Sequence, residues 1–233
     1  KTSTTYRTRI NFTGSTETDG GLTAGAFTRV NISGGATGPN FSGSRVWISN
    51  GTVTLTLGNA GGAVATNGMI FGCGVGFTGS CVDMANPNFS WVTFSSGGAG
   101  ANVMRLDFAL GGANVSVSGG NGNDTEIAAS FSVGNAKVGI GYDAGAGATG
   151  GTRINVSFDA GSATVGLDMA QSNGTTGYTA KVTYAMGSGS LYVFAGNSIN
   201  AAATGTNAVY GISYSMGLGG GATAAISVRS VAG

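Results

Sequence analysis

Apolar and polar residues alternate strictly along Arg153-Ile154-Asn155-Val156-Ser157-Phe158-Asp159, and the same alternation runs through Thr52-Val53-Thr54-Leu55-Thr56-Leu57. Successive side chains of a β-strand point to opposite faces of its sheet, so this period predicts strands with one apolar and one polar face. No segment shows the period of a helix clearly, so we expect an all-β chain. The pattern predicts fourteen strands, at 3–13, 22–31, 44–49, 52–59, 102–110, 113–119, 126–133, 136–143, 152–159, 163–171, 177–186, 189–196, 207–215 and 221–229.

The charged residues of these predicted strands all fall in the polar register. They are Arg7, Arg9, Arg29, Arg45, Arg105, Asp107, Glu126, Lys137, Asp143, Arg153, Asp159, Asp168, Lys181 and Arg229. In a water-soluble sandwich the apolar faces would pair into a core. In a membrane barrel they would face lipid, and the polar faces would line a wet lumen. The alternation alone leaves both architectures open.

Composition favours the membrane barrel. Only 8% of the 233 residues are charged, against about 25% in a typical soluble domain. The non-apolar faces carry mostly Thr, Ser, Asn and Gly rather than the Lys and Glu that cover soluble proteins. A net charge of +1, without a basic cluster interleaved with aromatic residues, argues against a nucleic-acid partner.

Tight turns alternate with longer connectors along the chain. Asn50-Gly51, Gly111-Gly112 and Gly134-Asn135 supply residues that tolerate the positive φ of short hairpin turns. Longer Gly/Ser/Thr/Asn segments, such as 32–43 and 144–151, separate the hairpins. This order predicts an up-and-down meander, which in outer-membrane barrels places short turns and long loops on opposite sides of the membrane.

The connector 60–101 is exceptional, because it has about 40 residues whereas unstructured loops longer than about 12–15 residues are uncommon and usually functional. It is also rich in apolar residues, namely Met69, Ile70, Phe71, Phe77, Met84, Phe89, Trp91 and Phe94. Such side chains gain about 1.5–3 kcal/mol each on leaving water. We therefore expect this loop to fold inward against the strands of a single domain that spans 1–233.

Three stretches resemble the general porins of alphaproteobacteria (Rhodobacter-type). Residues 8–25 resemble their second and third strands, residues 46–59 resemble the hairpin before their pore-constricting third loop, and residues 213–222 resemble their last hairpin. The resemblance is specific over about the first 60 residues and this late hairpin, and is only a strand rhythm elsewhere.

The resemblance implies a transmembrane antiparallel up-and-down β-barrel of 16 strands, which packs as a homotrimer. It also implies a location in the bacterial outer membrane, surrounded by the lipid bilayer and lipopolysaccharide. Ions and small hydrophilic solutes would diffuse passively through the water-filled channel, and 60–101 would be the constriction loop.

The chain departs from the porin pattern at both ends. Such porins usually close with a strand that ends in an aromatic residue, whereas this chain ends at Val231-Ala232-Gly233. They also begin with a strand ahead of the first one recognised here. One further strand beyond each end would give 16, an even number as in bacterial barrels. The alternative is a complete barrel of 14 strands.

Seven charged residues are predicted to line the pore or its constriction. They are the wall residues Arg7, Arg9, Arg29, Arg45, Arg105 and Asp107, and the loop residue Asp83. In the resembling porins, wall arginines face several loop acids, but here acids are scarce and Asp107 is placed to neutralise Arg105. An excess of positive charge in a narrow channel predicts a weak anion preference. Alternatively, the arginines only hold the wall together through hydrogen bonds to neighbouring carbonyls.

Cys73 and Cys81 are the only cysteines, and both lie in the long loop. They form either a disulfide, as an oxidising periplasm or cell surface would permit, or two buried free thiols. The stretch 119–124 resembles half of a calcium-binding β-roll repeat, but it occurs once and reads better as a loop of turn formers. A structural Ca²⁺ near Asp124 stays possible, and no other metal or cofactor is expected.

No catalytic constellation is recognisable, so we do not expect an enzyme. The sequence contains no His, which removes Ser–His–Asp triads. Asp107, Asp143, Asp159 and Asp168 lie on different predicted strands and fit a lumen wall better than acid/base pairs. Two other functions remain open. A secreted structural or adhesive β-protein would not need detergent, and a sugar-specific channel would need lumen aromatics, of which we expect only Phe27 and Trp47.

Overall fold

The computed structural model describes residues 7–33, 38–68, 83–89, 91–98, 100–120, 125–145 and 149–230. Contacts within the chain separate two compact units. The N-terminal unit comprises 1–66 and 91–128, and the C-terminal unit comprises 67–90 and 129–233. The long loop is therefore shared, because its two ends belong to the N-terminal unit and its middle to the C-terminal unit.

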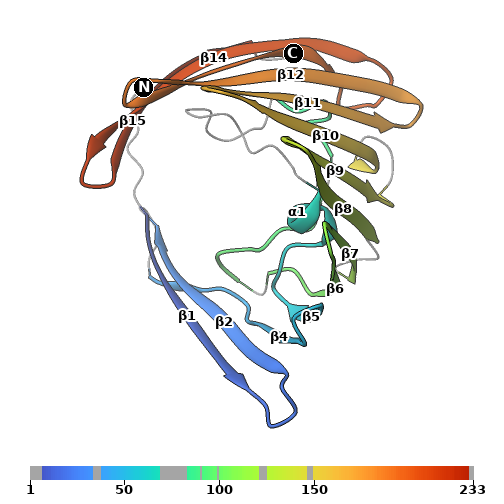
Figure 1. Ribbon diagram of the computed structural model, residues 1–233, viewed down its shortest axis with the longest axis vertical. Coiled ribbons are helices and arrows are strands. Elements are labelled where there is room, and N and C mark those ends of the chain that lie inside the picture. Colours follow the sequence, from blue (N-terminus) through green and yellow to red (C-terminus); the bar gives the residue numbers. More distant parts are fainter. Residues whose placement is uncertain are drawn as a thin grey trace. The chain divides into compact units, whose positions relative to one another are not determined.

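The N-terminal unit is built from strands and the start of one short helix (Figure 1). Its strands are β1 (Arg7–Glu17), β2 (Thr23–Ser33), β3 (Asn40–Phe41), β4 (Arg45–Ser49), β5 (Val53–Gly58), β6 (Val103–Leu110) and β7 (Ala113–Gly120). The helix α1 (Ala63–Asn67) follows β5, and β8 (Glu126–Val133) crosses the boundary between the units. A five-residue helix is too short to leave a periodic signal in the sequence, which is why it is not predicted.

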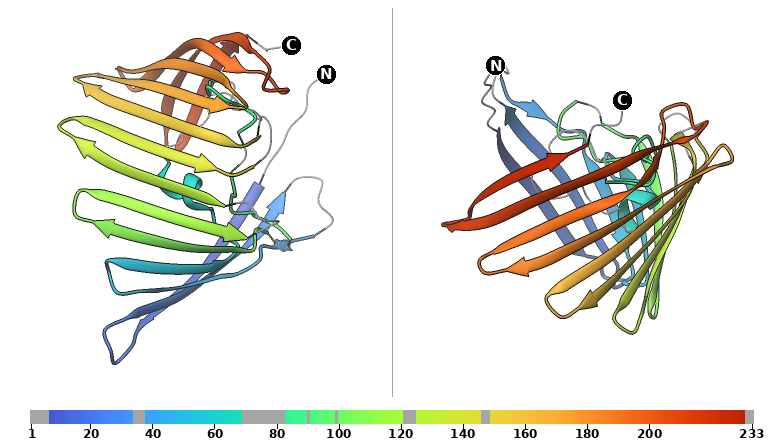
Figure 2. Two further views of the ribbon diagram at one scale, coloured as in Figure 1. Left: turned by 90° about the vertical axis from the view of Figure 1, so that its right-hand side faces the viewer. Right: turned by 90° about the horizontal axis from the view of Figure 1, so that it is seen from above.

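The C-terminal unit is an antiparallel sheet whose strands lie side by side in chain order (Figure 2). Its strands are β9 (Ala136–Asp143), β10 (Gly151–Ala160), β11 (Ala163–Ser172), β12 (Thr175–Met186), β13 (Gly189–Ile199), β14 (Thr206–Gly219) and β15 (Ala222–Arg229). Among the described residues, no helix has the length and the apolar character needed to cross a membrane.

The hydrogen-bonded order of the sheet follows the chain, with only β3 set off the path beside β2. The predicted meander is confirmed, and each of the fourteen predicted segments corresponds to a strand. The observed strand ends differ from the predicted ones where hydrogen-bonded pairing with the neighbouring strand continues beyond the alternating sequence. The strand expected at 3–13 is described at 7–17 and pairs to its end, Glu17 with Thr23. The strand β14 likewise continues to Gly219 across a bulge.

One connector departs from the predicted alternation of tight and long. The predicted strands 163–171 and 177–186 leave a connector at 172–176, but β11 and β12 are joined by a two-residue turn at Asn173-Gly174 with φ of 48° and 76°. The ladder continues to the pair of Ser172 with Thr175. Asn and Gly are the residues that tolerate positive φ at both turn positions, so this hairpin closes tightly.

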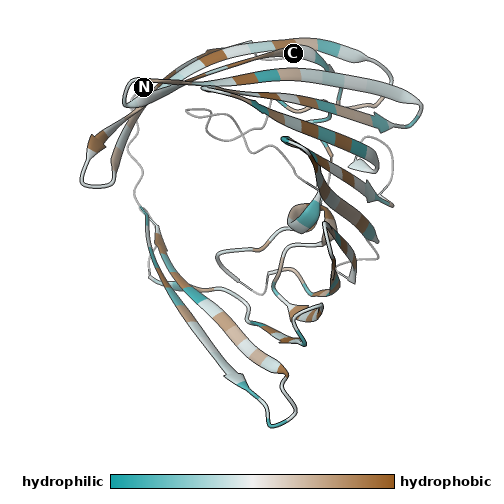
Figure 3. Cartoon of the chain, in the orientation of Figure 1, coloured by the Kyte–Doolittle hydropathy of each residue, from teal (hydrophilic) through white to brown (hydrophobic). Residues whose placement is uncertain are grey.

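Burial along the strands is the reverse of that in a soluble protein. In β11, Leu167 and Met169 are 56% and 46% exposed, whereas Asp168 and Ala170 between them are each 1% exposed. Figure 3 shows the same alternation of hydropathy along neighbouring strands. Soluble proteins bury apolar side chains and expose charged ones. In β11 the apolar register is thus left for a non-aqueous environment, and the polar register is covered by the chain.

Candidate functional site

The two ends of the long loop are held in the N-terminal unit by side chains of the polar register. Glu126 of β8 accepts a hydrogen bond from the backbone amide of Val64 through Oε2 at 2.8 Å, and from that of Val92 through Oε1 at 2.5 Å. Ser118 of β7 accepts one from the amide of Ala63 at 2.8 Å. The helix α1 and the returning end of the loop are therefore bound to the same wall.

Asn59 joins the same two ends closer to the strands. Its side-chain amide donates to the carbonyl oxygens of Ser95 at 2.8 Å and Gly43 at 3.0 Å, and its Oδ1 accepts from the amides of Ser95 at 3.0 Å and Ala101 at 3.3 Å. A Cβ on Gly100, whose φ is 71°, would lie 2.2 Å from the Asn59 side chain. The fit of Asn59 therefore requires glycine at position 100.

The middle of the loop, 83–85, is bound through its backbone in the C-terminal unit. Thr179 Oγ1 of β12 donates to the carbonyl oxygen of Asp83 at 2.8 Å. Ser198 Oγ of β13 donates to that of Met84 at 2.5 Å. The Met84 side chain is fully buried. Backbone groups that leave water need partners, and here wall hydroxyls supply them.

Ala85 completes this docked segment. Its amide donates to Asp168 Oδ2 at 2.8 Å, and its carbonyl oxygen accepts from the amide of Ile199 at 2.8 Å. A Cβ on Gly177 would lie 2.3 Å from the Ala85 carbonyl oxygen. The absence of a side chain at Gly177 therefore lets the loop backbone approach the sheet.

The predicted pore residue Asp83 has its carboxylate buried in the C-terminal unit. The hydroxyl of Tyr192 donates to Asp83 Oδ2, and Lys181 Nζ lies 3.6 Å from the same oxygen. The Asp83 side chain is 1% exposed. Its negative charge is thus neutralised by Lys181 and does not face water.

Arg105 and Asp107, two positions apart on β6, form an ion pair with Arg105 Nε 2.9 Å from Asp107 Oδ2. This pairing confirms the expectation that Asp107 neutralises Arg105. Ser116 also donates to Asp107, and Arg105 Nη1 donates to the carbonyl oxygen of Gly61 in the loop. Arg105 therefore acts as a wall-to-loop link as well as a paired charge.

Arg29 and Arg45 stack on two aromatic rings. The guanidinium carbon of Arg45 lies 4.1 Å from the ring centroid of Phe27, and that of Arg29 lies 4.8 Å from the ring centroid of Phe94 in the loop. The two rings meet edge to face at 5.6 Å. Arg29 also donates to Ser96 Oγ of the loop at 3.0 Å. Cation–π contacts orient both guanidinium groups without neutralising them.

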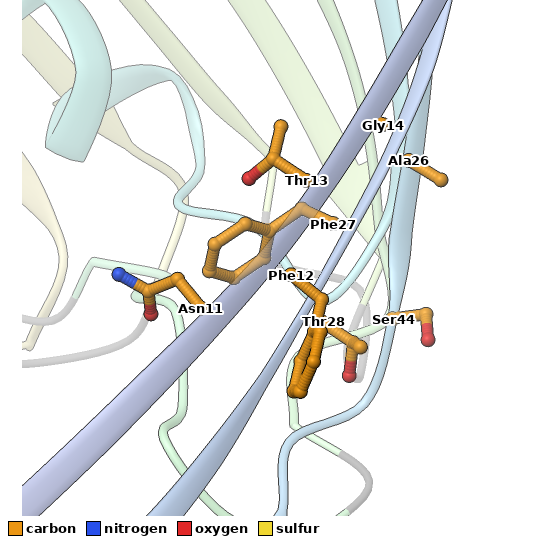
Figure 4. Close-up of a pocket in the computed structure, with 8 residues that line it drawn as sticks. All are labelled: Asn11, Phe12, Thr13, Gly14, Ala26, Phe27, Thr28 and Ser44. Carbon is orange, nitrogen blue, oxygen red and sulfur yellow. The ribbon is translucent and has the colours of Figure 1, made fainter.

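Arg7 and Arg9 lie on β1, whose residues are exposed on both faces. Arg9 Nε donates to Asn31 Oδ1 at 3.3 Å across the pair of β1 and β2. Figure 4 shows a hollow along these two strands, with Asn11 and Phe27 pointing to one side of the ribbon and Thr28 to the other. Asn11 accepts from Arg29 Nε at 2.7 Å.

Four of the five predicted arginines have no ion-pair partner among the residues that the structure describes. Within the described ranges, no carboxylate lies at ion-pair distance from Arg7, Arg9, Arg29 or Arg45. The alternative role of these arginines, hydrogen bonding to neighbouring carbonyls, is met at three of them. Arg105 donates to the backbone carbonyl of Gly61, and Arg9 and Arg29 donate to the side-chain carbonyls of Asn31 and Asn11. The arrangement is a row of guanidinium groups with few acids nearby.

Sequence reasoning missed several residues that bind the loop. Glu126 and Asp168 are placed in the polar register, but nothing in the sequence assigns them to loop amides. Tyr192 and Phe194 correct the expectation that only Phe27 and Trp47 are aromatic in the lumen register, because both are buried on the polar face of β13. The alternation with Leu191 and Val193 is the signal that could have located them.

Cys73, Cys81 and Asp124 lie outside the described ranges, so the disulfide and the calcium site stay predictions. Among the described residues, no group of three or more His, Cys, Asp or Glu side chains is arranged to hold a metal ion.

Comparison with known proteins places this arrangement in a family. Residues 1–232 match the family model described as Gram-negative porin. The fold is similar to solved structures of variants of the Rhodopseudomonas blastica porin. One triple mutant matches with a TM-score of 0.79 at 22% identity, and a second triple mutant and a double mutant each match with 0.81 at 23%. Each match covers 97% of this chain and 85% of the other.

None of the curated proteins matches the chain. The alternative of a secreted structural or adhesive protein is not favoured, because the family match extends over the whole sheet and the loop. The chain belongs to the Gram-negative porins, the outer-membrane β-barrels through which ions and small hydrophilic solutes diffuse passively.

Proposed function

We propose that 60–101 is the constriction loop of this diffusion channel and that the channel weakly prefers anions. The observation that supports the constriction is the binding of the loop backbone, at both ends and in the middle, by side chains of the polar register. In a porin that register faces the aqueous lumen. A loop bound there reduces the cross-section open to solutes.

The four arginines without an ion-pair partner among the described residues support the anion preference. Asp107 is paired with Arg105, and the Asp83 carboxylate is buried beside Lys181. The remaining guanidinium groups raise the local concentration of anions in a narrow channel, because low-dielectric walls focus their field. Dissolved salt screens the field of these arginines, so we expect the preference for anions to be modest.

We also propose that the chain forms one barrel domain, 1–233, and that three copies pack as a homotrimer in the lipopolysaccharide-containing outer membrane. The trimer rests on the porin resemblance. Chemical cross-linking of the native protein in mild detergent should yield a ladder that ends at the trimer, and a ladder that ends at the monomer would contradict it.

Conductance in a planar bilayer tests the constriction. Deleting 66–96 should raise single-channel conductance several-fold, because the lumen then fills with water along the polar register. Unchanged conductance would rule out the loop as the constriction.

The zero-current potential in a KCl gradient tests the selectivity. The unmodified channel should favour chloride, and Arg7→Ala combined with Arg9→Ala should reduce that preference. Lys137→Ala serves as the control, because it removes a cation from β9, outside the strands that flank the loop. A clear cation preference in the unmodified channel would contradict the proposal.

A further inference from the structure

We infer that Glu126 is the positioning residue that holds together the two ends of the long loop, at 62–64 and Val92, which we call its neck. It thereby sets how far the loop extends over the wall. The inference rests on the proposed role of 60–101 as the constriction. It adds a single wall side chain on which the position of the loop depends, at a place where the sequence shows no motif.

The neck is closed by a short chain of hydrogen bonds. The amide of Gly62 donates to the carbonyl oxygen of Val92 at 2.8 Å, which joins the two ends of the loop directly. Glu126 then accepts from the amide of Val92 at 2.5 Å and from that of Val64 at 2.8 Å. Each carboxylate oxygen thus serves one end of the loop, and one side chain ties both ends to β8.

The neck is buried, so the hydrogen bonds of Glu126 are not replaced by bonds to water when they are lost. Glu126 and Val64 are fully buried, and Val92 is 7% exposed. A buried amide without an acceptor costs about as much as a lost hydrogen bond, because water cannot replace the partner. Hydrogen bonds to an ionised carboxylate are also stronger than neutral ones. Either end of the loop therefore loses a strong anchor when Glu126 is changed.

Glutamine cannot reproduce the double contact. A carboxylate offers an acceptor on both oxygens, whereas the glutamine side chain has one acceptor oxygen and one donor nitrogen. In Glu126→Gln, one of the two loop amides would face an N–H group. One end of the loop would be released while the other stayed bound.

The packing around Glu126 also requires glycine in the loop. A Cβ on Gly62 would lie 2.2 Å from Glu126 Oε2. Gly62→Ala therefore displaces the carboxylate from the loop side without altering its charge. Asn59 keeps both loop ends attached nearer the strands, so either variant should loosen the loop rather than detach it.

The experiment compares the unmodified channel, Glu126→Gln, Gly62→Ala and the 66–96 deletion in planar bilayers. Glu17→Gln, an exposed site on β1, is the matched control for Glu126. Gly112→Ala, where a Cβ meets nothing within 4 Å, is the control for Gly62. Heat-modifiable mobility on gels shows which variants contain the folded barrel.

We expect folded Glu126→Gln and Gly62→Ala channels to show several-fold larger open-channel current noise and a conductance shifted toward that of the deletion. Loss of stability alone would lower the yield of folded protein but leave the noise of folded channels unchanged. Noise and conductance equal to the controls in both variants would overturn the inference. If Glu126→Gln does not fold, Gly62→Ala decides. Failure of the deletion to alter conductance would instead refute the constriction itself.

Discussion

Arg153 and Asp168, on the neighbouring strands β10 and β11, form a fully buried ion pair with two parallel hydrogen bonds. Arg153 Nε lies 2.8 Å from Asp168 Oδ1, and Nη2 lies 2.7 Å from Oδ2. Asp168 also accepts from Asn155 at 2.9 Å and from the loop amide of Ala85 at 2.8 Å. One carboxylate therefore stabilises the wall and binds the loop at the same time.

Asp168→Asn should destabilise the protein strongly. The change leaves the Arg153 guanidinium buried without its counter-charge, which typically costs about 3–5 kcal/mol. Equilibrium unfolding in urea, with the protein refolded into lipid vesicles, measures the loss. Asp159→Asn is the control, because Asp159 lies at the exposed end of β10, where surface substitutions change stability by about 0.5 kcal/mol or less. Equal stability of the two variants would contradict a structural role for the pair.

Gly177→Ala should push the docked segment 83–85 off the sheet. The added Cβ would lie 2.3 Å from the Ala85 carbonyl oxygen and 3.0 Å from that of Asn197, and overpacking of this kind costs about 1–3 kcal/mol. A lower urea midpoint and a changed conductance are expected together. Gly217→Ala is the control, because a Cβ there meets nothing within 4 Å. A channel identical to the control would show that the loop tolerates the displacement.

Asp107→Asn should increase the anion preference. Removing this carboxylate releases the charge of Arg105, its ion-pair partner at 2.9 Å. At 0.1 M salt, the zero-current potential should move closer to the equilibrium potential of chloride. The shift should shrink at 1 M, where the screening length falls from about 10 to about 3 Å. Asp159→Asn removes the same charge from a strand that does not flank the loop, and a shift of equal size there would argue against a local effect.

Tyr192→Phe should weaken the binding of the loop in the C-terminal unit. The Tyr192 hydroxyl donates to the buried carboxylate of Asp83, and hydrogen bonds to charged groups contribute about 1.5–3 kcal/mol. Lys181 still faces Asp83, so the fold should persist with a lower urea midpoint. Tyr210→Phe, at a side chain that is 62% exposed, is the control. An unchanged midpoint in Tyr192→Phe would mean that this contact adds nothing to stability.

Much of the fold could be predicted because it depends on local patterns. The order Leu167-Asp168-Met169-Ala170 assigns faces to β11 directly, since side chains alternate along any strand. Strand ends were less predictable, because cross-strand pairing extends them beyond the alternation, as in β1 and at the Asn173-Gly174 turn. The charged wall residues and the pair of Arg105 with Asp107 also follow from the register.

The contacts that bind the loop to the strands could not be predicted from the alternating sequence. Glu126 and Asp168 bind backbone amides of Val64, Val92 and Ala85, and a backbone amide is chemically the same at almost every residue. Which amide meets which carboxylate therefore depends on where the folded chain brings them. The alternating sequence alone determines that the sheet has a polar and an apolar face. Three-dimensional packing decides that the polar face binds the loop, because side chains of that face supply hydrogen-bond partners to buried backbone groups of the loop.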